Sequence, residues 1–232
     1  MTMTRPALLA SRMIGAACAA CAACAACGSA PPPLPRRQVL SVDAAPGDYP
    51  CVLRDPRELP GSFMVQQTID IRAVRDGRPV EGQLDAVLQK QGDALVIIGL
   101  GPMNARAFTL TQRGRRIEFE QRLGPALPFS PRNILVDVHR VFFKALPRPG
   151  GAAGTGVVRG ELDGERVEER WERGELRSRS FARPGSELRG AVRVEYGAGC
   201  RAGRCEPASV TVHNEWFGYT LAITNHGYEA LD

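Results

Sequence analysis

Cysteine is the residue type whose spacing in this chain could most readily do chemistry. Four of the seven cysteines, Cys18, Cys21, Cys24 and Cys27, form an overlapping Cys-x-x-Cys series, a spacing that can hold a metal ion or an iron–sulfur cluster. Every residue between them is alanine, so no neighbouring side chain could orient the ligands. We therefore predict no metal site here.

The other three cysteines indicate a disulfide. Cys200 and Cys205 bracket Arg-Ala-Gly-Arg in an expected turn between two strands, and in an oxidising compartment we predict a local bridge between them. Pairing of Cys51 with either of them is the alternative, because spacing alone does not decide the connectivity.

No other set of residues indicates catalysis. His139, His213 and His226 do not stand at a metal-ligand spacing such as His-x-x-x-His. The chain has no Gly-x-Ser-x-Gly motif, and Gly99-Leu100-Gly101 lacks the third glycine and the following helix of a dinucleotide site. Carboxylates are spread over turns and alternating strand positions. We predict a non-enzymatic protein with no cofactor and no metal.

The N-terminus has the order of a secretory signal. Arg5 and Arg12 precede an uncharged run from Met13 to Ala26, as the charged and apolar regions of such signals do. The run is too short to cross a bilayer comfortably. We predict a signal peptide over residues 1–26.

The end of this run resembles the lipobox of bacterial lipoproteins, in which a cysteine is acylated and becomes the new N-terminus. Small residues precede Cys27, and Gly-Ser follows it. The resemblance implies an acyl anchor on Cys27. Because Ser29 rather than aspartate follows Cys-Gly, it also implies attachment to the outer membrane, facing the periplasm. The usual leucine is replaced by Cys24, and the alternative anchors are Cys18, Cys21 and Cys24.

Residues 27–60 are expected to form a lipidated N-terminus, a spacer and an irregular entry to the domain. Pro31-Pro32-Pro33-Leu34-Pro35 favours extended polyproline backbone, which would hold a domain away from a membrane. Residues 38–60 mix proline, glycine and aspartate, and predict irregular chain with one short helix or edge strand.

Residues 61–232 predict one domain built mainly from antiparallel strands. Apolar and polar residues alternate in short runs between 63 and 123 and again between 157 and 225, as side chains do along half-covered strands. The run 94–100 is continuously apolar and predicts a strand covered on both faces. The turns between the first runs are Asp76-Gly77, Gln91-Gly92 and Arg113-Gly114. About ten or eleven strands follow from this pattern.

Two further segments complete the predicted domain. Ser130 and Pro131 suit the N-cap and the first position of one main helix. One apolar face of this helix comprises Ile134, Leu135, Val138, Val141, Phe142 and Ala145. Val136 and Phe143 lie off this face, and we interpret them as surface residues, with a second contact surface as the alternative. The arginine- and glutamate-rich strands between 157 and 181 are expected to form a solvated face with surface ion pairs.

The charge pattern disfavours nucleic acid as a partner. The chain has 30 basic and 25 acidic residues, which gives a net charge of +5. Its arginines are interleaved with glutamate and are not clustered with aromatic residues, as a nucleic-acid site would require.

The order of these segments resembles the outer-membrane lipoprotein carrier and receptor proteins of the Lol pathway, the LolA/LolB-like fold. More closely, it resembles a family of uncharacterised bacterial lipoproteins that share this fold. The motifs that carry the resemblance are Gln67-Thr68-Ile69-Asp70-Ile71, Ile97-Ile98-Gly99-Leu100-Gly101, Ala107-Phe108-Thr109-Leu110, Ile134-Leu135-Val136-Asp137-Val138, and Asn214 with Tyr219-Thr220-Leu221. The resemblance implies a mainly β (α+β) fold: a curved, incomplete antiparallel β-barrel with the helix over its open side.

Such a fold has a concave sheet face in which a hydrocarbon chain could lodge. Burial of apolar surface, at about 25 cal/mol per Å², would supply affinity without a polar specificity group, so we expect an apolar trough with no ionisable groups at its floor. The residues expected to line it are Val65, Ile69, Ile71, Leu84, Leu88, Ile97, Phe108, Leu110, Ile117, Phe119, Leu135, Val138 and Phe142. The alternative for each is simple packing in the core.

The predicted function is that of an outer-membrane-anchored, monomeric lipoprotein that binds or transfers an acyl chain, a lipid or a lipoprotein in the periplasm. By resemblance to the receptor, Met103 would face the membrane, with Leu127 and Phe129 as equal candidates. The alternative is an accessory lipoprotein that binds a protein partner through an edge strand or through Val136 and Phe143.

Overall fold

The structure is a computed structural model in which residues 34–232 form one compact unit. The predicted signal peptide, Cys27 and the proline-rich segment as far as Leu34 lie outside the described residues. The described residues are 35–43, 49, 51–75, 77–124, 129–147, 154–183, 190–201 and 204–231. Among these, no helix is long and apolar enough to cross a membrane.

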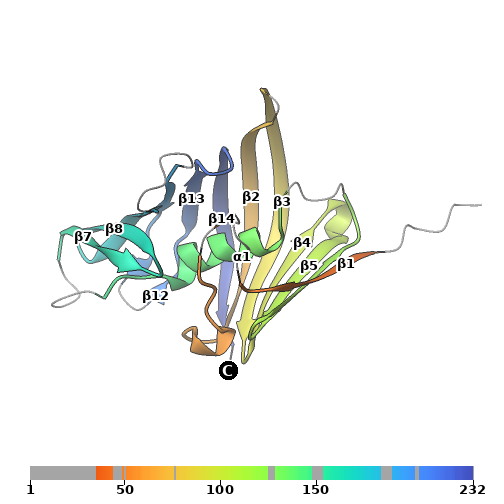
Figure 1. Ribbon diagram of the computed structural model, residues 1–232, viewed down its shortest axis with the longest axis horizontal. Helices are drawn as coiled ribbons and strands as arrows, with labels where there is room; N and C mark the ends of the chain where they lie inside the picture. Colours follow the sequence, from red (N-terminus) through yellow and green to blue (C-terminus); the bar gives the residue numbers. More distant parts are fainter. Residues whose placement is uncertain are drawn as a thin grey trace, which may run out of the picture. The chain divides into compact units, whose positions relative to one another are not determined.

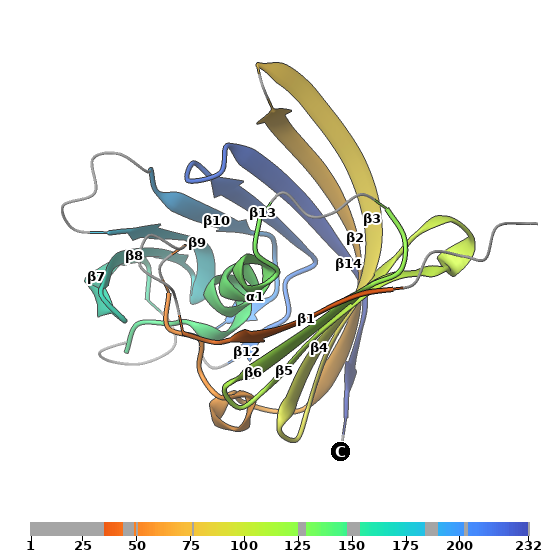
Figure 2. The same ribbon diagram turned by 45° about the vertical axis from the view of Figure 1, so that its right-hand side comes forward.

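Fourteen antiparallel strands form one curved sheet that does not close. From one edge they run β1-β6-β5-β4-β3-β2-β14-β13-β10-β9; the two-residue strands β11 and β12 extend this path, while β8 and then β7 pair beyond β9. The bounds are β1 Arg36–Ser41, β2 Phe63–Arg75, β3 Arg78–Gln91, β4 Ala94–Leu100, β5 Arg106–Arg113, β6 Arg116–Gln121, β7 Gly156–Leu162, β8 Glu165–Glu172, β9 Glu175–Ala182, β10 Val192–Tyr196, β11 Cys200–Arg201, β12 Arg204–Cys205, β13 Ser209–Asn214 and β14 Tyr219–Ala230. Figures 1 and 2 show the sheet curving around one central helix.

The predicted half-barrel is therefore present, with more strands than expected. The eleven strands that the alternation predicts correspond to β2–β10, β13 and β14. The additional strands are β1, an exposed edge strand in the segment expected to be irregular, and β11 and β12, which are too short to show any alternation. The turn glycines Gly77, Gly92 and Gly114 adopt positive φ angles of 74°, 54° and 51°, as tight turns require.

The C-terminal strand joins the two halves of the sheet. β14 pairs with β13 on one side and with β2 on the other, with a bulge between Asn225 and Gly227. β2 in turn pairs with β3 along its whole length, from Phe63 opposite Lys90 to Arg75 opposite Arg78. Figure 1 shows this β2–β3 hairpin projecting beyond the neighbouring strands.

The helix differs from its predicted form at both ends. The N-cap is Pro131 and not Ser130 as predicted, and no side chain of the described residues caps this end of the helix. Ser130 accepts a hydrogen bond from the Asn133 N–H through its carbonyl, at 2.9 Å. α1 (Arg132–Val138) then continues as a π-helical turn, His139–Phe143, which ends where the Lys144 N–H donates to the His139 carbonyl at 2.9 Å. Ala145, predicted on the apolar face, lies beyond the helix and is exposed. Two short 3-10 helices, η1 (Pro56–Glu58) and η2 (Pro102–Asn104), lie elsewhere.

The prediction that the helix buries only one face is wrong. Val136 and Phe143, expected at the surface, are buried, so neither offers a contact surface to a protein partner. The polar residues of the helix are buried as well: Arg132, Asn133, Asp137, His139, Arg140 and Lys144. The reason is that the helix lies within the concave side of the sheet (Figure 2) and meets protein in most directions.

Gly99 and Gly82 provide a test of the packing between strands. A Cβ atom on Gly99 would lie 2.2 Å from the ring of Phe108, its cross-strand neighbour, whereas a Cβ on Gly82 would meet nothing within 4 Å. We expect Gly99→Ala to lower the free energy of unfolding by about 1–3 kcal/mol through overpacking. Gly82→Ala is the matched control and should leave it unchanged or slightly raised. Urea denaturation measures both, and equal effects of the two substitutions would contradict this packing.

Candidate functional site on the concave face

The concave face of β2–β6 is mainly apolar, with Gln67, Lys90, Gln112 and Gln121 as its buried polar residues. Five of the predicted trough residues stand directly opposite one another and form one row across five strands: Val65, Leu88, Ile97, Leu110 and Phe119. This row is closed from solvent, and Ile117 and Leu135 are buried beside it. These seven residues pack in the core, which is the alternative that the sequence left open.

The other six predicted trough residues remain partly accessible. Ile69, Ile71 and Leu84 lie nearer the tip of the β2–β3 hairpin, and Phe108 lies one row above the closed row. Val138 and Phe142 lie on the helix. We call these six residues, together with Ile134 of the helix, the apolar strip. All seven are half-buried, so burial decreases along the concave face toward the hairpin tip.

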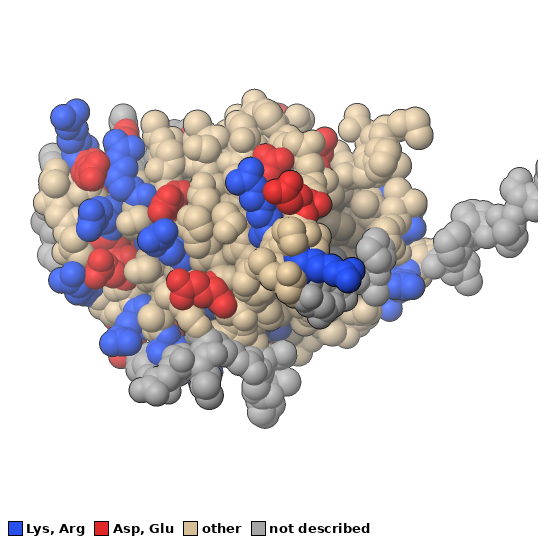
Figure 3. Space-filling model, turned by 90° about the horizontal axis from the view of Figure 1, so that it is seen from above, with Lys and Arg blue, Asp and Glu red and all other residues tan. Residues whose placement is uncertain are grey.

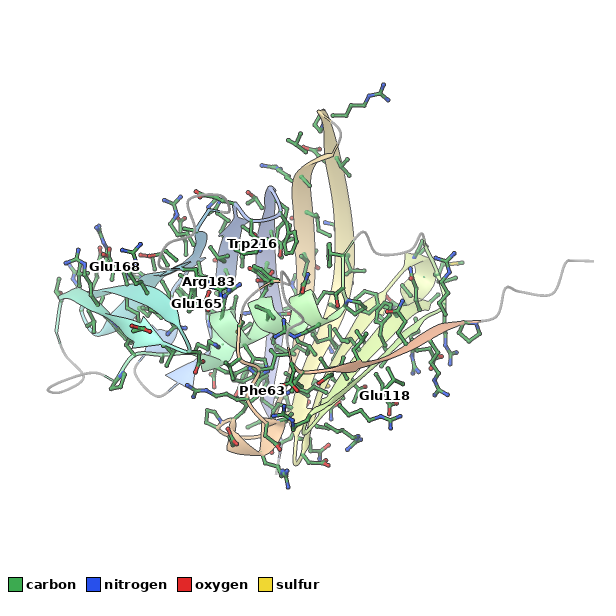
Figure 4. All side chains as sticks on the ribbon, viewed as in Figure 1. Phe63, Glu118, Glu165, Glu168, Arg183 and Trp216 are labelled. Atoms are coloured by element: carbon green, nitrogen blue, oxygen red, sulfur yellow. The ribbon has the colours of Figure 1, made fainter. Side chains whose placement is uncertain are left out.

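The concave face of the opposite half of the sheet carries buried ionisable groups, which the sequence did not predict. Arg140 of the helix donates to Glu165 of β8 at 2.5 Å, and its guanidinium lies 4.4 Å from the ring centre of Tyr49. Figure 4 labels Glu165 close to α1 and Glu168 away from it. Lys144 pairs with Asp163 at 2.5 Å. The expectation of a trough free of ionisable groups is therefore wrong. In the half formed by β2–β6, Lys90 of β3 is also buried on the concave face, two residues from Leu88.

A second ion pair ties the helix to β9. Arg179 donates to Glu169 of β8 at 2.8 Å and to the carbonyl of Arg140 at 3.0 Å. Glu169 also accepts from the indole N–H of Trp171 and from the Leu146 N–H, both at 3.1 Å. Glu165, Glu169 and Arg179 are buried, so the prediction of a solvated face is wrong for the inward side of β8 and β9. The outward side carries surface ion pairs as predicted, such as Arg159 with Glu168.

Asp137 is the third tie and connects the helix to β13 and β14. Its carboxylate accepts from the hydroxyl of Tyr49 at 2.9 Å and from that of Tyr219. Asn214 donates to both tyrosine oxygens, at 2.8 and 2.9 Å. Burial raises the pKa of Asp137 and of both tyrosines, and the charge of Asp137 raises the tyrosine pKa values further. The phenols therefore remain protonated donors.

This buried cluster is closed to substrates. Arg140 is 1% exposed, and Lys144 and Glu165 are equally enclosed. Among the described residues, no group of three or more His, Cys, Asp or Glu side chains could hold a metal. The cluster's evident effect is mechanical, because Arg140 joins the helix to β8, Arg179 joins it to β9, and Lys144 joins its C-terminal end to the turn that contains Asp163.

His139 is neutral and oriented by Gln112 of β5. The amide nitrogen of Gln112 donates to the carbonyls of Arg54 and Gly114, at 2.8 and 3.3 Å. Its oxygen therefore faces the His139 Nε2 atom at 3.0 Å, and Nε2 must carry the proton. Burial, aided by the charge of Lys144, lowers the pKa of His139 to about 3.

The remaining histidines lie apart from the cluster, whereas the thiol of Cys51 lies beside Lys144 and Arg140. His213 of β13 lies 3.3 Å from the Thr220 hydroxyl, and His226 of β14 lies 2.7 Å from the Thr68 hydroxyl. Cys51 is a free, buried thiol whose pKa is raised by burial. Cys200 and Cys205 stand directly opposite each other on β11 and β12. Their side chains lie outside the described part of the structure, so the bridge stays a prediction.

The three candidates for membrane contact have different surroundings. Met103 is 98% exposed on η2, where it adopts a positive φ of 56°. Phe129 is half-buried and stacks on Phe217 at 5.8 Å. Leu127 lies outside the described residues. Membrane contact stays a prediction, and Met103 is the candidate whose side chain is free of packing.

An unclosed, curved antiparallel sheet with one helix on its concave side defines the protein as a β half-barrel. Comparison with family models matches residues 64–227 to a family described as "Protein of unknown function (DUF3261)", and the chain belongs to this family. The resemblance found in the sequence, to a family of uncharacterised proteins, is confirmed. No curated protein matches the chain.

Solved structures similar to the chain include a LolA superfamily protein from Nitrosomonas europaea, with 12% identity over 77% of this chain and 89% of that one and a TM-score of 0.43. A putative outer membrane lipoprotein-sorting protein domain from Vibrio parahaemolyticus has 8% identity over 73% and 85%, with a TM-score of 0.44. A DUF1329 family protein from Desulfovibrio piger has 12% identity over 75% and 87%, with a TM-score of 0.31. Identities this low concern the fold alone.

The Arg140 cluster predicts large differences between buried and surface ion pairs. Arg140→Met should lower the free energy of unfolding by about 3–5 kcal/mol, because it leaves Glu165 buried without its partner. The double variant, Arg140→Met with Glu165→Met, should lose less free energy of unfolding than the single variant Arg140→Met. The matched control is Arg159→Met, which removes an exposed ion pair with Glu168 and should change stability by about 0.5 kcal/mol or less. Thermal or urea unfolding measures these changes in stability. Similar losses of stability in Arg140→Met and Arg159→Met would contradict the role of the cluster.

The pKa of His139 predicts acid sensitivity. Its folded value of about 3 lies below the unfolded value of about 6.5, so the unfolded state binds the proton first. Stability is lost as pH falls below about 6.5, and the loss reaches about 2 kcal/mol at pH 5. His139→Gln keeps a donor toward Gln112 and should reduce this loss. Urea unfolding at pH 7 and pH 5 measures it; identical losses in both proteins would refute the assignment.

Proposed function

We propose that this protein is a non-catalytic lipoprotein of the cell envelope that binds a hydrocarbon chain along the apolar strip. The chain would belong to a lipid, a fatty acyl group or an acylated protein. The observation that supports this proposal is that the helix face turned toward the centre of the sheet is its least buried face. An apolar face in that position would normally be the most buried one.

The direction of this face follows from its neighbours. Asp137 bonds Tyr219 of β14, whereas His139 bonds Gln112 of β5. Val138 stands about 100° from each of them on one side of the helix, and Arg140, on the opposite side, donates to Glu165 of β8. Val138 therefore faces the strands that separate β14 from β5, namely β2, β3 and β4. Ile134, Val138 and Phe142 follow at four-residue spacing, and all three are half-buried.

The sheet opposite this face has room for a ligand. Gly82 of β3 stands opposite Ile71, two residues from Leu84 and on the same side of the strand. A side chain placed at Gly82 would meet nothing within 4 Å. A chain that covered Ile69, Ile71 and Leu84 would gain roughly 0.8 kcal/mol for each methylene removed from water.

The buried ion pairs fit this proposal because they lie on the side of the helix that faces away from the apolar strip. They hold the helix against β8–β10 and contribute no polar group to the strip, so specificity would come from shape and length. The seven closed core residues are not proposed as ligand contacts.

We also propose that residues 1–26 are a signal peptide and that acylated Cys27 anchors the domain to the outer membrane on its periplasmic side. A disulfide between Cys200 and Cys205 suits that oxidising compartment. Met103 would contact the membrane. The exposed charges of the domain are interleaved on the face seen in Figure 3 and are not gathered by sign.

The proposal is tested with protein purified from membranes and analysed by native mass spectrometry, followed by titration with a fluorescent fatty acid. We expect co-purifying lipid and saturable binding. Leu84→Gln should weaken binding about tenfold, which corresponds to about 1.4 kcal/mol.

The matched control adds the same side chain to the outer face of the sheet. Ala222 is exposed there, and Ala222→Gln should bind the fatty acid as the wild type does. Equal affinities of the two variants, or no binding by the wild-type protein, would refute a ligand on the strip.

A further inference from the structure

A groove of about 700 Å³ opens near the tip of the β2–β3 hairpin, between β2 and β3 on one side and β10, β13 and β14 on the other. None of the residues that the sequence singled out for the trough lines it. Its lining combines two arginines, a histidine and hydroxyl groups with apolar residues of the β2–β3 hairpin. The sequence gives no signal for this groove, because its residues come from strands far apart in the chain.

Four donor side chains of the groove stand in one row across the sheet. Arg72 of β2 is opposite Thr220 of β14, Thr220 is opposite His213 of β13, and His213 is opposite Arg193 of β10. Adjacent strands lie about 4.8 Å apart, so the two arginines flank the threonine and the histidine over about 14 Å. Strand side chains alternate between faces, so this row lies on the face opposite Ile71 and the apolar strip.

The row has the chemistry of an oxyanion site. Guanidinium groups bind phosphate oxygens in a bidentate manner through charge-assisted hydrogen bonds, and hydroxyl and imidazole groups can donate from between them. Both arginines are engaged only by exposed carboxylates. Arg72 lies 3.8 Å from Glu81, and Arg193 lies 3.3 Å from Glu195. Such surface pairs contribute little, so a doubly charged phosphate can replace them.

The wall beside the row is apolar. Val74 is 66% exposed and Val80 is 45% exposed, and both line the groove with Pro79. The carboxylate of Glu215 also lines it, but this group accepts the Ala191 N–H at 3.0 Å. Glu81, the partner of Arg72, lines the groove as well. The groove therefore offers cationic donors with exposed carboxylate partners on one side and an apolar surface on the other.

We propose that this groove binds a phosphate group, with Arg72 and Arg193 as its charged ligands and Thr220 and His213 between them. The phosphate could belong to a phospholipid headgroup or to a soluble phosphate. The site lies on the opposite face from the apolar strip, and its test does not depend on hydrocarbon binding.

The test uses the full lipidated protein in detergent with two probes. Inorganic phosphate is titrated by isothermal calorimetry. Co-flotation is compared between vesicles with and without phosphatidylglycerol, so that binding through the acyl anchor is subtracted. Arg72→Gln and Arg193→Gln should each weaken binding of the recognised probe about tenfold, and the double variant should abolish it. If the arginine variants lose binding of both probes, the site is assigned to phosphate in general. If they lose binding of the vesicles alone, it is assigned to a lipid headgroup.

Arg159→Gln is the control, because it removes the same charge from an exposed arginine of β7 and should bind both probes as the wild type does. Binding of the fluorescent fatty acid should be unchanged in Arg72→Gln, which separates this site from the proposed hydrocarbon site. The proposal is overturned if the wild type binds neither probe, or if Arg159→Gln weakens binding as much as Arg72→Gln.

Discussion

A guanidinium buried between the helix and the sheet is the constraint on which the rest of this structure depends. Arg140 cannot leave water without a partner, because an uncompensated buried charge costs several kcal/mol. Glu165 of β8, the ring of Tyr49 and the carboxylate of Asp137 lie around it. The helix can satisfy this group in one position only, so the electrostatics determine where an otherwise short helix lies on the concave face.

The position of the helix decides what the concave face can do. Arg179 and Tyr196 bond the backbone of the π-helical turn at 3.0 and 2.9 Å, and Asp137 is held by two tyrosines. These ties pull the helix toward β8–β10 and β14, so it does not collapse onto β2–β4. The side chains between the helix and these central strands stay partly accessible, and a ligand would meet a surface that is already formed.

Alternation of apolar and polar residues was sufficient to predict eleven of the strands and the turn glycines, because each of these depends on neighbours along the chain. The half-barrel was predicted from the resemblance to a known fold. It failed for Glu165, Glu169 and Arg179, which occupy inward positions beside Val167 and Trp171. A charged residue in a strand is predicted to be exposed to solvent unless its partner is known. The partner of Glu165 is Arg140, which lies on the helix 25 residues earlier. The same limit applies to the row from Arg72 to Arg193, because it exists only once the register of four strands is known.

The account's central claim is that a hydrocarbon chain lies between the Val138 face of the helix and strands β2 and β3. Photo-crosslinking with a diazirine-bearing fatty acid, followed by peptide mass spectrometry, tests this most directly. The account predicts adducts on Ile134, Val138 or Phe142 of the helix and on Ile69, Ile71 or Leu84 of the sheet. Adducts confined to exposed residues elsewhere, such as Val157 or Tyr228, would contradict it.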